Sequence, residues 1–276
     1  MWNLKKSIDD VAVIQEPDTI VTYFQLSQYI DNLSNNIPDR SLVFCLCNNS
    51  IGSLIGYVAF LNAKIVPLML EDDVDRGLLD SLINIYHPEY FWIPSKIEGY
   101  FENCVSIYSD HDFTLLKSSI SQKPILHNDL ALLLSTSGST GSKKLVRLSY
   151  ENLRSNTESI VEYLEIDGKE SSITTLPMSY SYGLSIINSY LQAAASIVMT
   201  NKTLVQKEFW SLLKNHNVTS FGGVPFTYEM LNRLKFFQME LPSLRVLTQA
   251  GGKLSLELQR KFAKYARENG KRFYVM

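Results

Sequence analysis

The chain lacks an excess of charge, a cysteine framework and a histidine cluster, and each absence removes a class of function. Lys and Arg number 26 against 28 Asp and Glu, a net charge of -2, so no field gathers nucleic acid or an anionic membrane. The three cysteines, Cys45, Cys47 and Cys104, have neither metal-ligand spacing nor an even count, which favours buried thiols. No role is assigned to the four histidines, which share no motif and are expected in loops or at the surface: His87, His111, His127 and His216.

Signals for export and for membrane insertion are also missing. The acidic pair Asp9 and Asp10 stands where a signal peptide has its apolar core. The most apolar later stretch, residues 186–199, falls short of a membrane span because four polar residues interrupt it: Asn188, Ser189, Gln192 and Ser196. These observations favour a cytoplasmic protein with neither a membrane nor a nucleic-acid partner.

What is present is a globular composition with a large apolar fraction. The 276 residues are 45% hydrophobic and 20% charged, which argues against disorder and predicts a substantial core. The length suits one large α/β domain or two ordinary ones. No repeat, low-complexity tract or linker marks a boundary, and the one candidate seam between subdomains is the loop at residues 166–171.

Apolar runs alternate with helical patterns through the first part of the chain. A strand, a helix and a strand are predicted at residues 42–47, 54–61 and 65–70, followed by a helix at 75–86 and a strand at 90–93. The apolar runs are continuous, as in strands that are covered on both faces. The pattern therefore predicts an α/β fold with a mostly parallel sheet. The stretch that follows, up to Asn128, has weaker patterns and receives no element.

The alternation continues after a predicted hairpin. A buried strand at residues 130–134 and an alternating strand at 144–148 flank a Gly-rich turn, and Ser149 is the expected N-cap of a helix at 150–164. Further strands are predicted at residues 173–176, 196–200, 218–221, 245–248 and 272–275, and further helices at 184–192, 205–215, 226–234 and 255–269.

The turn at residues 135–144 has a composition that suits an anion. It holds four serines, two threonines, two glycines and two lysines directly after a buried strand. Glycines let backbone N–H groups approach a phosphate, hydroxyls donate further hydrogen bonds, and a lysine offsets the charge. The loop is therefore a candidate site for a triphosphate tail.

Two other interpretations of this loop have different requirements. A Walker A loop has Gly immediately before Lys-Ser or Lys-Thr and a helix after it. Here Ser142 precedes Lys143, and a strand-like segment follows Lys144, so the register disfavours a P-loop kinase or ATPase. A hydroxyl-rich hairpin turn without a ligand stays open on composition alone, because short motifs produce false positives.

Six other short segments follow one another along nearly the whole chain and have the appearance of motifs: residues 48–50, 63–68, 146–153, 177–184, 223–227 and 244–254. Together with the loop at 136–144, they resemble the motifs of the adenylate-forming superfamily of acyl-CoA synthetases, nonribosomal-peptide adenylation domains and luciferases. The loop departs from that family at its end, where Lys143 replaces a usual proline and Leu145 a common glycine. The resemblance implies the N-terminal part of a layered αβαβα fold with mostly parallel sheets.

The resemblance also implies roles for particular residues. The phosphates of ATP would be bound by Thr136, Ser137, Gly138, Ser139, Thr140, Gly141 and Lys144. The adenine would face Gln249, Ala250, Gly251 and Gly252, which on sequence alone also suit an ordinary strand-to-helix turn. The carboxylic acid would lie in a pocket formed by Tyr180, Tyr182, Gly183, Phe221, Gly222 and Pro225, although most tyrosines are half-buried packing residues.

Enzymes of this family join a carboxylate to the α phosphate of ATP, expel pyrophosphate, and pass the acyl group to the thiol of coenzyme A or of a carrier-protein pantetheine. The resemblance therefore implies an acid–thiol ligase that uses ATP and Mg²⁺, acts on a small carboxylic acid and in some cases works with an acyl carrier protein.

Three parts of the family's machinery have no counterpart in residues 1–276: a magnesium-binding glutamate, a ribose-binding aspartate and a C-terminal domain with its lysine. We therefore expect a truncated N-terminal adenylation domain, without catalytic or metal-binding residues of its own and unable to complete catalysis. Two alternatives stay open. One is a natural non-catalytic protein that binds a nucleotide or an acyl group on the same scaffold, and the other is an α/β scaffold for protein contacts.

Overall fold

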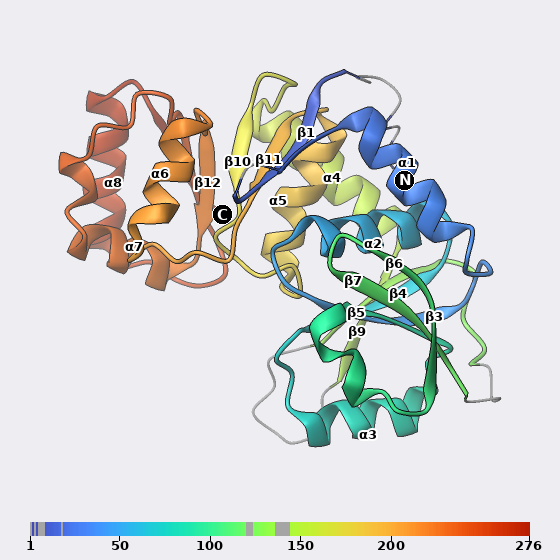
Figure 1. The fold of residues 1–276 in the computed structure, drawn as a ribbon. Helices are drawn as coiled ribbons and strands as arrows, with labels where there is room; N and C mark the ends of the chain where they lie inside the picture. Colours follow the sequence, from blue (N-terminus) through green and yellow to red (C-terminus); the bar gives the residue numbers. More distant parts are fainter. Residues whose placement is uncertain (1, 3, 5–8, 18, 120–123, 136–143) are drawn as a thin grey trace.

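The computed structural model describes residues 2, 4, 9–17, 19–119, 124–135 and 144–276. Within these residues the strands form two sheets of seven strands each, and helices cover both faces of each sheet (Figure 1). The first sheet has the order β14-β13-β12-β10-β11-β1-β2 and is parallel except for its β1–β2 hairpin. Its strands are β1 (Val11–Gln15), β2 (Thr19–Thr22), β10 (Ser171–Ile173), β11 (Ser196–Met199), β12 (Ser220–Gly223), β13 (Val246–Gln249) and β14 (Arg272–Val275).

The second sheet has the order β6-β7-β5-β3-β4-β8-β9. Its centre is parallel, from β5 through β3 and β4 to β8, and each edge is an antiparallel addition. Its strands are β3 (Leu42–Cys47), β4 (Val66–Glu71), β5 (Tyr90–Pro94), β6 (Cys104–Asp110), β7 (Phe113–Ser118), β8 (Leu130–Ser135) and β9 (Leu145–Ser149). All five residues of β5 and all six of β3 are buried, as the continuous apolar runs predicted.

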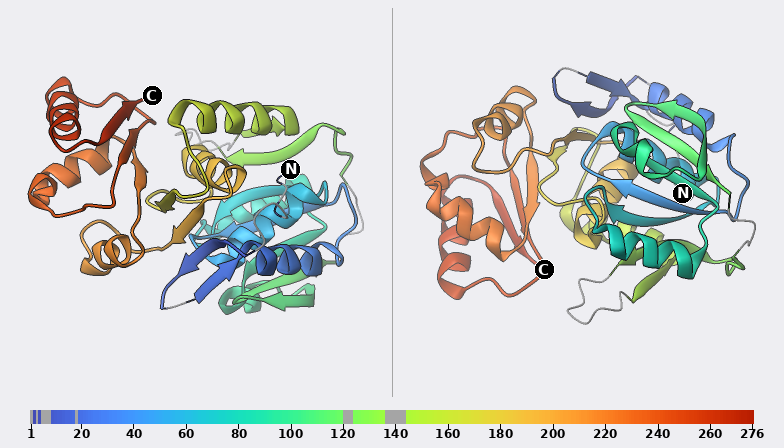
Figure 2. Two further views of the ribbon diagram at one scale, coloured as in Figure 1. Left: turned by 90° about the horizontal axis from the view of Figure 1, so that it is seen from above. Right: turned by 60° about the horizontal axis from the view of Figure 1, so that its bottom comes forward.

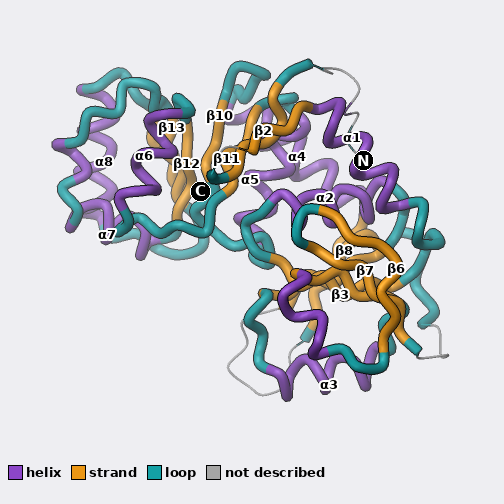
Figure 3. The backbone as a smooth tube through the Cα atoms, viewed as in Figure 1, coloured by secondary structure: helices purple, strands orange, loops and turns teal. Residues whose placement is uncertain are grey.

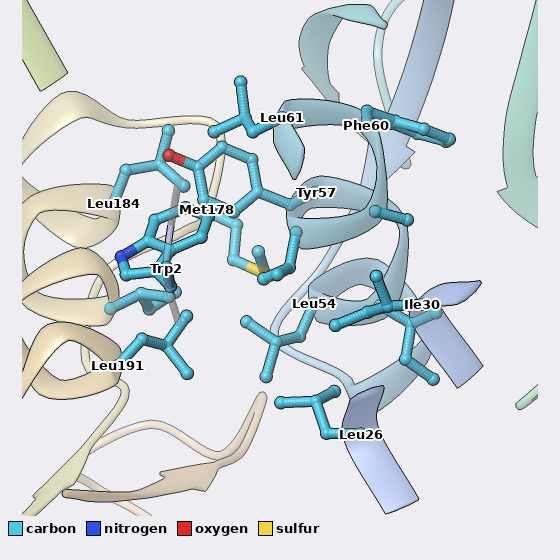
Figure 4. Close-up of a cluster of buried hydrophobic side chains, with 14 of the residues drawn as sticks. Trp2, Leu26, Ile30, Leu54, Tyr57, Phe60, Leu61, Met178, Leu184 and Leu191 are labelled. Carbon is cyan, nitrogen blue, oxygen red and sulfur yellow. The ribbon is translucent and has the colours of Figure 1, made fainter. Parts of the chain in front are cut away.

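Four helices fill the space between the two sheets: α1 (Tyr23–Ser34), α2 (Ile51–Asn62), α4 (Tyr150–Leu164) and α5 (Ser181–Gln192). Helix α2 is buried on every side from Ile51 to Leu61, which explains why its sequence is apolar all round. Figure 4 shows Leu54 and Tyr57 of α2 facing Leu184 and Leu191 of α5, with Trp2 packed between them.

The outer faces of the two sheets are covered by the remaining helices. Helix α3 (Arg76–Tyr86) packs on the second sheet, while α6 (Lys207–Asn215), α7 (Pro225–Arg233) and α8 (Leu256–Glu268) pack on the first (Figures 2 and 3). Short 3₁₀ turns lie at Ser95–Tyr100 and Phe236–Gln238. The expected layered αβαβα fold with mostly parallel sheets is therefore confirmed. No helix in the described part of the chain combines the length and apolar composition needed to cross a bilayer.

The element predictions differ from the structure mainly at boundaries. The N-cap predicted at Ser149 is confirmed, since its hydroxyl accepts from the N–H of Asn152. The structure adds a capping box, because the side chain of Asn152 accepts in turn from the N–H of Ser149. The strand expected at 173–176 ends at Ile173, and the one expected at 218–221 lies two residues later, at 220–223. Cys45 and Cys47 are buried as expected, but Cys104 is half-buried because β6 is an edge strand.

Two regions with no prediction contain regular structure: the β1–β2 hairpin with α1, and the β6–β7 hairpin. The candidate seam at residues 166–171 forms the connection from α4 to β10, where the chain passes into the first sheet. A division into two subdomains at that point stays a prediction.

Candidate functional site

The expected phosphate loop is closed by the β8–β9 hairpin. Ser135 at the end of β8 pairs with Leu145 at the start of β9, so the loop leaves and re-enters the second sheet at the same point. The two predicted strands and their hairpin pairing are therefore confirmed. The loop residues Thr136 to Gly141 lie outside the described residues, and Lys144, the first described residue after them, is exposed.

A cavity of about 680 Å³ lies beside this hairpin. Ser135, Val146 and Leu148 form one wall, and Ser179, Tyr180 and Ser181, at the start of α5, form another. The start of α5 thus lies across the cavity from β8 and β9, the strands that flank the expected phosphate loop. The third wall is the end of β4 and the residues after it, including Glu71 and Asp73.

The start of α5 is fixed by close packing. A Cβ at Gly183 would lie 2.3 Å from the carbonyl oxygen of Pro177, so a larger residue would displace the segment before the helix. Tyr182 is buried, and its hydroxyl lies 2.8 Å from the hydroxyl of Thr248 on β13. Burial raises the pKa of Tyr182 to about 12, so the phenol is neutral at physiological pH.

The turn expected to face the adenine, residues 250–252, follows β13 and is held by hydrogen bonds from the side chain of Gln249. Gln249 is fully buried, and its side-chain amide donates to the carbonyls of Ala250 at 3.0 Å and Gly252 at 2.9 Å. Its side-chain oxygen has no hydrogen-bond partner within the described residues. Gly251 has φ +76° and Gly252 φ +155°, a region that residues with a side chain rarely adopt. The turn therefore depends on Gln249 and on two glycines.

This turn lies against two of the residues expected in the acid pocket. A Cβ at Gly251 would be 2.5 Å from the hydroxyl of Tyr180, and a Cβ at Gly252 would be 3.2 Å from Cγ of Pro225, the first residue of α7. Tyr180 also lines the cavity beside the phosphate-loop hairpin. It thus contacts both regions where the two ends of a nucleotide are expected.

The remaining residues expected in the acid pocket are divided between the two faces of β12. Gly222 faces α5, because a Cβ there would lie 2.8 Å from the hydroxyl of Tyr182. Phe221 points to the opposite face, where it packs in the core with Phe236 at a ring distance of 6.2 Å. The structure thus brings Tyr182 and Gly222 together but separates Phe221 from both.

Sequence reasoning missed the carboxylates at the end of β4. Glu71 and Asp73 line the cavity beside the hairpin and also a second cavity of about 590 Å³, which reaches Asn48 and the residues after β10 and β11. Glu71 accepts a hydrogen bond from the hydroxyl of Ser179 at 3.3 Å. Their position directly after a buried parallel strand was the available signal, since ligand sites in such sheets lie at carboxyl ends.

Across the described ranges, no group of three or more His, Cys, Asp or Glu side chains is placed to hold a metal ion. The geometry nevertheless suits a nucleotide. Tyr180 lines the cavity beside the hairpin that brackets the hydroxyl-rich loop, and its hydroxyl lies against the glycine turn, so the turn and the cavity adjoin at one aromatic side chain.

Comparison with known proteins gives one family. The model of the AMP-binding enzyme family matches residues 2–275, nearly the whole chain. Bacitracin synthase 3 of Bacillus licheniformis is 24% identical over 272 residues, which cover 93% of this chain and 4% of that protein. The D-alanine--D-alanyl carrier protein ligase of Staphylococcus aureus (strain JH9) is 22% identical over 204 residues, which cover 71% of this chain and 41% of that ligase.

Solved structures agree on the fold. The O-succinylbenzoate coenzyme A synthetase MenE of Bacillus subtilis, in complex with AMP, superposes with a TM-score of 0.79 at 18% identity, over 100% of this chain and 59% of MenE. In each of these comparisons the match spans less than two thirds of the relative's own length.

Proposed function

Because the chain belongs to the AMP-binding enzyme family, we propose that it forms the nucleotide- and acid-binding part of an acid–thiol ligase. In the reaction, a carboxylate oxygen attacks the α phosphorus of ATP, and the bond from that phosphorus to the bridging oxygen breaks to release pyrophosphate. The acyl-adenylate then transfers its acyl group to a thiol sulfur, and AMP leaves.

One observation carries this proposal: Tyr180 contacts both the turn at 250–252 and the cavity beside the β8–β9 hairpin. These two regions are the expected sites of the adenine and of the phosphates. Because β8, the turn after β13 and the start of α5 are far apart in sequence, the contact of Tyr180 with both the turn and the cavity beside β8 is a tertiary feature that a chance motif would not produce.

Each part of the site has a proposed role. The loop at 136–141 and Lys144 would hold the β and γ phosphates, and the small residues of the turn would let the base approach the backbone. Tyr182 and Gly222 would face the tail of the acid. Mg²⁺ would offset the phosphate charge in a cavity whose wall carries Glu71 and Asp73.

The acceptor thiol belongs to coenzyme A or to the pantetheine of a carrier protein. The second is supported by similarity to a protein named as a carrier-protein ligase, and the first by similarity to one named as a coenzyme A synthetase. We propose that residues 1–276 bind ATP but do not complete adenylation, because they contain no counterpart of the family's catalytic lysine.

Calorimetric titration of the chain with Mg·ATP tests the binding proposal. A triple variant with Gly138→Ala, Thr140→Ala and Lys144→Ala should bind at least tenfold more weakly, which corresponds to about 1.4 kcal/mol. The control is Lys169→Ala, an exposed lysine in the α4–β10 connection, which should bind as the unchanged chain does.

Pyrophosphate exchange with a mixture of carboxylic acids tests the catalytic part. We expect no exchange from residues 1–276. Exchange would contradict the proposed inability to complete adenylation, whereas a chain that does not bind Mg·ATP at all would contradict the proposed role of the site.

A further inference from the structure

A separate cavity of about 210 Å³ lies on the outer side of the second sheet, between α3 and the segment that enters β6 (Figure 1). Its walls come from α3, β5, residues 100–104 and the end of β7. Among the described residues, none that lines it also lines the cavity beside the β8–β9 hairpin or the cavity of about 590 Å³. It is therefore not part of the candidate functional site.

The deep part of this cavity is apolar and aromatic. Leu79 of α3 and Phe91 of β5 are buried there. Ile83, Phe101 and Cys104 are half-buried and pack against the same core cluster. The rings of Phe91 and Phe101 lie 4.9 Å apart at an angle of 51°. Because aromatic side chains favour a further ring in an offset or edge-to-face position, this part offers an aromatic ligand both apolar area and two ring partners.

The charged side chains of the cavity lie at its exposed rim. Arg76 and Asp80 form an exposed ion pair, with 3.3 Å between Nε and Oδ1. The guanidinium of Arg76 also donates to the carbonyl of Tyr100 at 2.8 Å and lies 5.7 Å from the centre of that ring. Glu102 is exposed as well. A ligand can thus keep a polar substituent in solvent at the rim while its apolar part is buried.

The volume of the cavity limits the size of the ligand. A cavity of about 150 Å³ lined by Leu, Ile and Phe is enough to bind benzene. About 210 Å³ therefore accommodates one ring with a small substituent. Pockets for drug-sized ligands have about 300–1,000 Å³, so a nucleotide, with its base, ribose and phosphates, exceeds this space.

We propose that this cavity is an accessory binding site for a small single-ring aromatic compound, whose ring packs against Phe91 and Phe101 and whose polar substituent faces the rim. The inference goes beyond the proposed function and does not rest on it, because the two sites share no described wall residue. The sites are neighbours along the chain, since Val74 and Asp75 line the cavity beside the hairpin and Arg76 lines this one.

Cys104 supplies a direct test on the unchanged chain. It lines the cavity and is half-buried, whereas Cys45 and Cys47 are buried. Alkylation of Cys104 by N-ethylmaleimide, followed by mass spectrometry, should slow about fourfold or more when the benzyl alcohol concentration exceeds its Kd about threefold, by mass action. Mg·ATP, which the cavity cannot contain, should leave the alkylation rate unchanged.

A matched compound tests the aromatic class of the ligand. Cyclohexylmethanol has the size and the hydroxyl of benzyl alcohol but a saturated ring. Because contacts between aromatic rings add to the burial of apolar area, benzyl alcohol should bind about threefold more tightly, or more, than cyclohexylmethanol. Protection of Cys104 against alkylation, measured over a range of concentrations, gives both dissociation constants.

Two variants test the position of the ligand. Cys104→Phe places a ring in the cavity and should abolish binding of benzyl alcohol, measured by saturation-transfer NMR. Val105→Phe adds the same ring at the next residue of β6, which is 67% exposed and does not line the cavity, and should bind as the unchanged chain does. Ile83→Phe fills the cavity from α3 and replaces Cys104→Phe if thermal unfolding shows that the latter is not folded.

The outcomes separate this inference from the proposed function. Equal alkylation rates with and without benzyl alcohol, or unchanged binding of benzyl alcohol by the filled variant, would overturn the site. Equal affinities for benzyl alcohol and cyclohexylmethanol would overturn the aromatic class of its ligand. Protection of Cys104 by Mg·ATP would show that the cavity is not separate from the nucleotide site. The calorimetric titration with Mg·ATP reports on the proposed function independently of these results.

Discussion

Two cavities share the start of α5 and differ in both size and charge. The one beside the β8–β9 hairpin has a volume of about 680 Å³ and carries Glu71 and Asp73 in its wall. The one beneath Tyr182 has a volume of about 20 Å³ and is lined by hydroxyl-bearing and apolar side chains, that of Met276 included. A single helix thus begins between a wide cavity with acidic side chains and a narrow one without them.

The difference shows how one scaffold can separate two tasks. A charged triphosphate and its cation need space, solvent and movable counter-charges, which the wide cavity provides. Selection of an acyl group needs a fixed shape and satisfied polar groups, which the narrow cavity obtains from a buried helix and strands. Tyr180 lines the wide cavity and Tyr182 the narrow one, so under the proposed function two residues at the start of α5 would divide the two tasks.

The largest expected effect on ATP binding is that of Gly251→Ala, which would disrupt the contact between the turn at 250–252 and Tyr180. The new Cβ would lie 2.5 Å from the Tyr180 hydroxyl on a backbone with φ +76°, so the turn or the ring has to move. We expect ATP binding to weaken at least tenfold by calorimetry. The matched control is Gly270→Ala, which has φ +63° but no atom within 4 Å of the added Cβ.

Gly270→Ala should therefore keep ATP affinity within about twofold and should change only the free energy of unfolding, by about 1 kcal/mol. Equal losses of affinity in the two variants would show that the contact with Tyr180 has no role in binding.

The second-largest effect concerns the protonation of Tyr182, which lines the narrow cavity. Because burial raises the pKa of Tyr182 to about 12, while an unfolded tyrosine ionises near pH 10, the folded form retains the proton longer. The stability contributed by Tyr182 is complete below about pH 10 and is lost as the pH rises toward 12, for a total of about 2–3 kcal/mol.

Denaturant unfolding at pH 8 and at pH 11 measures this loss. Tyr182→Phe should lose less stability between the two pH values than the unchanged chain, whereas Tyr163→Phe, at an exposed tyrosine of α4, should not differ from it. An identical pH dependence for Tyr182→Phe and the unchanged chain would contradict the burial of the phenol.

The turn at 250–252 is expected to depend on Gln249. Replacing it with Ala removes two hydrogen bonds that its buried side chain donates to the carbonyls of Ala250 and Gly252, and should lower the free energy of unfolding by about 2 kcal/mol in urea titrations. Gln259→Ala removes a single bond from a half-buried amide to the carbonyl of Leu254 and should cost below about 1 kcal/mol. If Gln249→Ala is as stable as Gln259→Ala, the internal support of the turn is not needed.

The smallest effect concerns the charge of the wide cavity. Asp73→Asn removes one exposed negative charge near the expected triphosphate and should strengthen the binding of magnesium-free ATP about twofold at low salt. The gain should shrink when Mg²⁺ or 0.5 M NaCl is added. Asp39→Asn, an exposed change outside the walls of the cavity, is the control and should have no effect.

The sequence was sufficient for the layered fold where buried residues form continuous runs, as in β3, β4 and β5. It was insufficient for β6, an edge strand whose side chains are mostly exposed, and for the β1–β2 hairpin with α1, whose short strands have weak patterns. Burial on two faces leaves a strong signal in the sequence, and edge position leaves a weak one.

The residues of the candidate site also differ in how far the sequence predicted them. The motif segments located Tyr180, Tyr182, Gly222 and the turn at 250–252, which the structure brings together. Phe221 shows why a motif does not assign orientation, since neighbouring residues of a strand point to opposite faces. Glu71 and Asp73 follow a predicted parallel strand, which was a signal for a ligand site, but the pairing of β4 with β8 that places them beside the hairpin is long-range and has no local pattern.

The central claim is that one bound nucleotide spans the turn at 250–252 and the β8–β9 hairpin. Backbone amide NMR during an ATP titration tests it most directly, with Gly251 and Gly252 reporting on the turn and Leu145 and Val146 on the hairpin. The account predicts that all four signals shift along one binding curve with the same Kd, while Val105 and Ile107 on the distant β6 edge do not move. Shifts confined to one region, or different dissociation constants for the two regions, would contradict it.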